Sequence, residues 1–131
     1  MAHEMISFDG RSRAFHHLEI ELCFRSLINE MMKSPSQTDV DTAKDWQEGL
    51  RYSEIGLINV DLHPHFQGPK DARRLLHLLD VSRRKLPQTG SVPVSDLNSE
   101  IGTTVQTSND HLDTAVIDNA FEKMKNFISG A

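Results

Sequence analysis

The sequence contains a single cysteine, Cys23, among its 131 residues. One thiol cannot form a disulfide within its own chain, and the usual structural zinc sites need pairs of cysteines. No unbroken apolar run approaches the roughly 20 residues that a membrane-spanning helix needs. The first residues carry no basic segment followed by an apolar stretch, so we expect no secretory signal. Together these absences predict a cytoplasmic protein without a membrane partner.

Motifs of several enzyme classes are also missing. Neither of the glycine-rich phosphate loops, G-x-x-x-x-G-K and G-x-G-x-x-G, occurs in the sequence. The zinc-protease motif H-E-x-x-H fails because Ser7 stands where the second histidine after His3-Glu4 would be. Cys23 lies among apolar residues, where a thiol usually behaves as a small hydrophobic side chain. We therefore expect no catalytic residue and no cofactor, and we interpret the chain as a non-enzyme.

A chain of this length allows one domain, here residues 1–131, with a core of its own. Apolar residues recur at helical spacing in four stretches. These predict helices over about 13–33, 38–60, 69–86 and 110–128. Short links between the first three favour antiparallel neighbours. The predicted fold class is all-α, an antiparallel four-helix bundle with a long connection before the last helix.

The stretch 38–60 has the clearest stripe. Its members follow one another at intervals of three and four residues: Ala43, Trp46, Leu50, Ser53, Leu57 and Val60. Gly49 and Gly56 weaken a helix here, although small residues also allow a neighbour to approach closely. The same stripe is a candidate seam for a homodimer.

Two stretches allow more than one interpretation. Residues 18–24 alternate between apolar and other residues, as a strand does, but they also lie on helical stripes. We favour a helix because glycine and proline are absent from 11–34. Residues 88–108 are rich in Ser, Thr, Gly and Pro, which predicts a mobile loop. Its valines allow a short strand there as an alternative.

Charge is unevenly distributed along the chain, whose net charge is −5. Residues 70–85 hold six cations against two acids, whereas residues 86–122 contain six acids and no Lys or Arg. The basic segment either faces the acidic part of its own chain and water, or binds an acidic protein partner. The candidate partner-binding residues are Arg73, Arg74, Arg83, Arg84 and Lys85. Nucleic acid is a weaker candidate for this segment, because overall acidity opposes nonspecific binding.

Three residues before the third predicted helix form a candidate metal site. Pro64 favours an extended conformation at His63, so Asp61, His63 and His65 can face the same way. Carboxylate and imidazole groups are common ligands of divalent metals, and His16 or His17 from a neighbouring helix is a candidate further ligand. The alternative is a turn with exposed imidazoles.

The sequence therefore favours a non-catalytic interaction protein, such as an adaptor, a chaperone or a regulatory subunit. Leu75–Leu86, with Asp80 and the Arg83-Arg84 pair, resembles a helix of flagellin-type export chaperones, which are also small helical bundles. The resemblance covers twelve residues and rests mostly on leucine spacing, so it assigns no family. A metal- or small-ligand-binding bundle and a nucleic-acid binder stay open as alternative functions.

Overall fold

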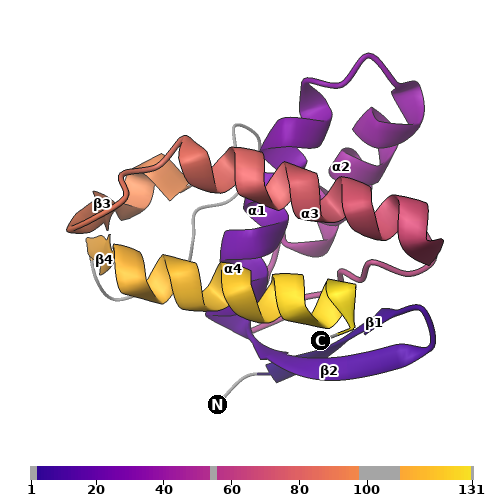
Figure 1. Cartoon of the computed structure of the whole chain (residues 1–131), viewed down its shortest axis with the longest axis horizontal. Coiled ribbons are helices and arrows are strands. Elements are labelled where there is room, and N and C mark those ends of the chain that lie inside the picture. Colours follow the sequence, from indigo (N-terminus) through magenta and orange to yellow (C-terminus); the bar gives the residue numbers. More distant parts are fainter. Residues whose placement is uncertain (1–2, 54–55, 98–109, 131) are drawn as a thin grey trace.

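The chain opens with a β-hairpin and continues with helices that pack around the first of them (Figure 1). The structure is a computed structural model that describes residues 3–53, 56–97 and 110–130. Strands β1 (His3–Phe8) and β2 (Arg11–His16) pair antiparallel. The remaining elements are α1 (His17–Met32), α2 (Gln37–Gly49), α3 (Gly68–Arg84), β3 (Ser91–Pro93), the 3-10 helix η2 (Val94–Leu97), β4 (His111–Asp113) and α4 (Thr114–Ser129).

Helix α1 is the centre of the core. It contacts α2, α3 and α4, and α3 and α4 run side by side across it (Figure 1). Its buried residues lie round the whole helix and include Ile20, Leu22, Phe24 and Ile28. A helix whose buried residues lie on every side has to be covered on every side. The other helices and the hairpin together supply that cover.

The prediction of an all-α four-helix bundle is wrong, because residues 3–16 form the β1–β2 hairpin. Asp9 and Gly10 form its two-residue turn, and both have positive φ angles, 51° and 77°. An Asp-Gly pair is favoured in such turns because Gly and Asp tolerate the left-handed region. Inside the hairpin, Ile6 and Phe8 alternate with more exposed residues and are completely buried. The first helix consequently begins at His17, four residues later than predicted.

The helix predicted over about 38–60 ends much earlier, at Gly49. The chain then turns back, and the amide of Asn59 donates a 2.9 Å hydrogen bond to the carbonyl of Gly49. A Cβ on Gly49 would lie 2.1 Å from the Asn59 carbonyl oxygen, so only glycine allows this approach. The stripe proposed as a dimer seam is mostly internal, because Ala43, Trp46 and Leu50 are buried in the core of the chain.

The other predicted segments agree more closely with the structure. Residues 18–24 are helical, α3 begins at Gly68-Pro69, and α4 ends at Gly130 in the left-handed conformation. In the connection 88–108, β3 forms and η2 follows, which makes the short strand the correct alternative for the valine at 92. The partner of β3 is β4, at the predicted start of the last helix, so that helix begins at Thr114 and not at about residue 110. Residues 98–109 lie outside the described part. That residues 1–131 form one domain stays a prediction.

Substitution of Gly49 tests the close approach at the end of α2. Gly→Ala in a helix normally stabilises by up to about 1 kcal/mol. For Gly49→Ala we expect the opposite, a loss of about 1–3 kcal/mol in the free energy of unfolding, because the new methyl group overlaps backbone. Urea titration followed by circular dichroism measures the change. Lys44→Ala, at an exposed position of α2, is the control that should be nearly neutral. A more stable Gly49→Ala protein would contradict the packing.

Candidate functional site

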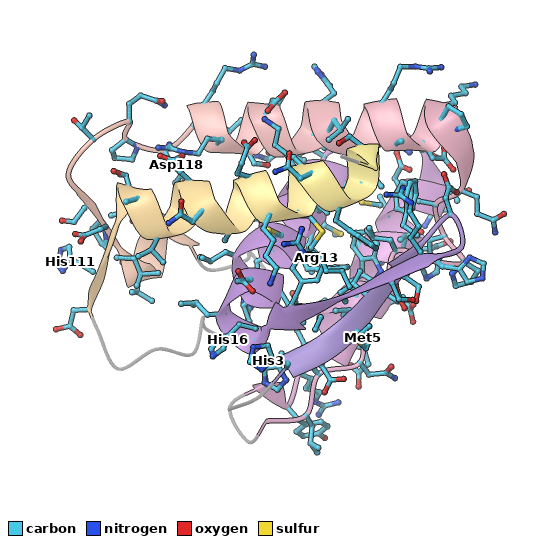
Figure 2. All side chains as sticks on the ribbon, turned by 60° about the horizontal axis from the view of Figure 1, so that its bottom comes forward. His3, Met5, Arg13, His16, His111 and Asp118 are labelled. Atoms are coloured by element: carbon cyan, nitrogen blue, oxygen red, sulfur yellow. The ribbon has the colours of Figure 1, made fainter. Side chains whose placement is uncertain are left out.

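The five predicted partner-binding cations fall into two groups. The residues of the first group form ion pairs within the chain. These three cations pair with carboxylates on the other helices and so hold α3 in place. The pairs are Arg74–Asp39, Arg83 Nε–Asp118 Oδ1 at 2.5 Å and Lys85 Nζ–Glu30 Oε1 at 2.7 Å. Asp118 lies on α4 (Figure 2), whereas Asp39 and Glu30 lie on α2 and α1. Much of the basic segment therefore neutralises acids of its own chain.

The second group forms an exposed surface that we call the basic face of α3. It consists of the two remaining predicted residues, Arg73 and Arg84, together with Lys70 and His77, and all four are exposed. Their spacing of three, four and seven residues places them on one side of the helix. Within the described ranges, Arg13, Lys44, Lys70, Arg73 and Arg84 are the cations that pair with no carboxylate and bond no carbonyl. Three of these five lie on the basic face.

Asp39 shows why Arg74 is a structural residue. Its carboxylate accepts from Arg74, and its Oδ2 accepts from Ser34 Oγ at 2.5 Å, which joins α2 to α3 and to the preceding loop. Burial raises the pKa of Asp39, but the hydrogen bonds and the positive charge of Arg74 outweigh it and leave this pKa below its ordinary value. The ion pair therefore stabilises the folded state wherever Asp39 is ionised.

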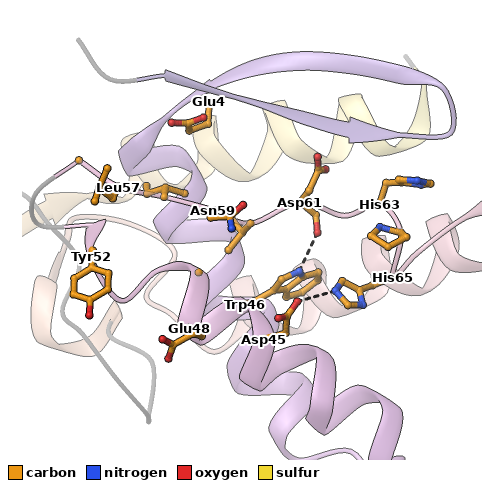
Figure 3. Close-up of a pocket in the computed structure, with 15 residues that line it drawn as sticks. Glu4, Asp45, Trp46, Glu48, Tyr52, Leu57, Asn59, Asp61, His63 and His65 are labelled. Atoms are coloured by element: carbon orange, nitrogen blue, oxygen red, sulfur yellow. Dashed lines mark hydrogen bonds and ion pairs between the residues drawn. The ribbon is translucent and has the colours of Figure 1, made fainter.

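The three predicted metal ligands do not converge. Asp61 Oδ1 accepts from the backbone amides of Ser7 and Leu62, each at 2.7 Å. His65 Nε2 lies 3.0 Å from Asp45 Oδ2 instead, and His63 is exposed (Figure 3). In the part of the chain that is described, no group of three or more His, Cys, Asp or Glu side chains is arranged to hold a metal. Metal binding by these residues stays a prediction that this geometry does not favour.

His16 and His17 lie at the start of α1 and have local roles. His16 Nδ1 accepts a 3.2 Å hydrogen bond from the Leu18 amide, while the Glu19 side chain accepts from the His16 amide at 2.7 Å. This reciprocal arrangement is a capping box that satisfies helix-terminal amides. His17 Nε2 lies 3.6 Å from Glu4 Oε1.

Cys23 is enclosed by the core and is a poor nucleophile. Its side chain is completely buried, and its Sγ donates to the carbonyl of Ala120 at 3.5 Å. Burial raises the pKa of the Cys23 thiol strongly, and the charge of Glu19 raises it further. The reactive thiolate is therefore scarce at neutral pH.

A groove of about 560 Å³ opens where α2 ends (Figure 3). Its walls are the last turns of α2, the returning segment that includes residues 56–65, and Glu4 on β1. Trp46 lies in its floor and donates from Nε1 to the Asp61 carbonyl at 2.9 Å. Tyr52 and Leu57, joined by a single β-bridge, lie together at one end.

Sequence reasoning missed this groove. It depends on the chain's reversal after Gly49, and a continuous helix over 38–60 would have kept Asp45 and Leu57 on separate turns. The available signal was the pair Gly49 and Gly56, two weak helix formers about two helical turns apart, in a stretch otherwise interpreted as one helix. Nothing in the sequence indicates that Glu4 would join the opposite wall.

No protein-family model, no curated protein and no solved structure matches the chain. Among residues 3–53, 56–97 and 110–130, no helix combines the length and apolar character needed to cross a membrane.

The Asp39–Arg74 pair predicts a pH-dependent contribution to stability. Because the folded-state pKa of Asp39 is lowered, the contribution is present above the unfolded-state pKa, about 4, and disappears as the pH falls through the lower folded-state value. We expect Asp39→Asn to cost roughly 1–2 kcal/mol at pH 7, an estimate reduced for the partial exposure of Arg74. Urea unfolding at pH 7 and at pH 2.5 measures this.

In that experiment the two proteins should differ less at pH 2.5 than at pH 7. Asp41→Asn, at an exposed position two residues along α2, is the matched control and should change little. An equal penalty at both pH values would contradict the ion pair as its source.

The burial of Cys23 predicts a protected thiol. We expect the folded protein to react with a thiol-specific chromogenic disulfide at least about 100-fold more slowly than the same protein in urea, because the reagent needs an accessible thiolate. The urea-unfolded chain is the internal control. Comparable rates in the two states would show that Cys23 is accessible.

Proposed function

We propose that this chain is a non-catalytic protein-binding domain that uses the basic face of α3 to bind an acidic partner. The carrying observation is the division of cations on α3. One row pairs with Asp39, Asp118 and Glu30, whereas the other row is exposed and pairs with no acid among the residues that the structure describes. The first row fixes the helix on three neighbours. The second row is therefore a rigid set of positive charges, which favours an oppositely charged surface.

The charge of the rest of the chain supports a specific contact. With His77 neutral the basic face carries three positive charges, although the chain as a whole carries −5. A net negative charge repels polyanions at a distance, so a long nucleic acid is disfavoured relative to a compact acidic patch on a protein. We place the protein in the cytoplasm, following the single cysteine. We assign it no cofactor and no catalytic residue.

Charge reversal on the basic face tests the proposal. The probe is a fluorescent peptide of twelve residues rich in Asp and Glu, titrated at low salt. Exposed ion pairs contribute roughly 0.2–1 kcal/mol each, so Arg73→Glu with Arg84→Glu should weaken binding by about two- to thirty-fold. Arg13→Glu with Lys44→Glu changes the net charge equally at exposed cations on β2 and α2, and it should have a much smaller effect (Figure 2).

Three outcomes would contradict the proposal. The peptide fails to bind even at low salt, or both double variants lose affinity equally, which would show an effect of net charge alone. The third is tighter binding of a DNA duplex than of the peptide, with a steep salt dependence, which would favour the nucleic-acid alternative. Circular dichroism of both variants checks that each is folded.

A further inference from the structure

The groove at the end of α2 shares no residue with the basic face of α3 and has the opposite charge. We propose that it is a second docking site, which binds an extended protein segment carrying a Lys or Arg beside an apolar side chain. The proposal stands independently of the basic face, because different residues and different chemistry carry it.

Charge on the groove walls selects a cation. Four of its fifteen lining residues are acids, and none of the fifteen is Lys or Arg. Asp45 Oδ2 lies 3.0 Å from His65 Nε2, and Glu48 Oε1 lies 3.2 Å from Arg51 Nη1. Both carboxylate side chains are nevertheless 67% and 68% exposed, so a cation from solvent can approach them alongside these partners. Glu4 stands on the opposite wall, on β1 (Figure 3). An ammonium or guanidinium group between these walls would meet carboxylates from both sides.

Exposed apolar side chains give the groove its second property. Tyr52 is 49% exposed and Leu57 60%, which makes them two of the four large hydrophobic side chains left exposed among the described residues. Their backbones are paired by an isolated β-bridge, and both side chains lie at one end of the groove. Adjacent exposed apolar groups next to a concave surface are typical of a contact with a partner. An apolar side chain of that partner would cover them.

The shape of the groove favours an extended segment over a compact ligand. In Figure 3 the groove runs from Tyr52 and Leu57 at one end, past Asn59 and Glu48, to His63 and His65 at the other. The apolar end and the acidic walls are therefore successive along its length. Neighbouring residues of one peptide can occupy them in turn, with the aliphatic stem of Lys or Arg lying on the apolar floor.

The chain contains its own reporter for this test, because Trp46 is the only tryptophan and lines the groove. We would titrate the full chain with a nine-residue peptide of alternating Lys and Leu and follow Trp46 fluorescence. Two matched peptides replace every Lys by Glu or every Leu by Ser. We expect saturable binding of the Lys-Leu peptide, and at least tenfold weaker binding of each of the others.

Substitutions in the groove test whether the peptide binds there. Asp45→Asn with Glu48→Gln should weaken binding of the Lys-Leu peptide at least fivefold, and Leu57→Ser should weaken it at least threefold. Asp41→Asn with Glu122→Gln removes the same charge at exposed positions outside the groove and should stay within twofold of the parent. Arg73→Glu with Arg84→Glu should not weaken this binding, which separates the groove from the basic face.

The proposal is overturned if the Lys-Leu peptide does not bind at low salt, or if the Lys-Ser peptide binds as tightly. It is also overturned if the control variant loses affinity to the same extent as the groove variant. Sedimentation velocity tests whether a second copy of the chain occupies the groove instead. A concentration-dependent dimer that is abolished by Asp45→Asn with Glu48→Gln would show that it does. All variants replace exposed side chains, and circular dichroism checks that they are folded.

Discussion

The enclosure of α1, which has nine buried residues and no exposed one, is the constraint on which the rest of the structure depends. Its apolar residues lie round the whole helix, and it also buries Glu21 and Arg25, whose side chains are 3.2 Å apart one turn from each other. Removing two charges from water is costly, and a close ion pair only partly offsets that cost. Such a helix is stable only when its neighbours exclude solvent on all sides. Helices α2, α3 and α4 cover most of α1, and the hairpin completes the enclosure.

This constraint explains why the hairpin is not an optional addition to a helical bundle. Arg11 on β2 donates to the carbonyls of Phe127 and Ile128 at 2.5 Å and 3.2 Å, so it binds the last turn of α4. Phe15 packs edge-on against Phe127, with ring centroids 5.6 Å apart. Through these contacts the hairpin, residues 3–16, closes the end of the core that the helices leave open.

The sequence predicts elements well where local signals and core packing agree. Helix α3 has a proline at its start and a proline soon after its end, and its leucines repeat at helical spacing, so its bounds differ from the prediction by only one or two residues. The hairpin is harder to predict, because its turn signal is a single Asp9-Gly10 pair and helical apolar stripes follow it closely. The early end of α2 was missed because the apolar period continues past Gly49 although the backbone does not. Periodicity records which residues are buried, and several backbone paths can bury the same residues.

Functional residues were harder to predict because a carboxylate or a cation has several uses that look alike in a sequence. Asp61 illustrates this. As a neighbour of two histidines it suggested a metal ligand, yet its carboxylate binds the Ser7 and Leu62 amides and its carbonyl accepts from Trp46. Asp61 thus links the hairpin, the returning segment and α2. Buried backbone amides left without an acceptor cost free energy, so a carboxylate can serve them instead of a metal. The same reasoning applies to α3, where Arg73 and Arg74 are adjacent in sequence but, within the described part of the chain, only Arg74 pairs with an acid. Whether a charged residue of α3 is free to bind a partner depends on which acids the neighbouring helices place beside it. The sequence of α3 alone does not contain that information.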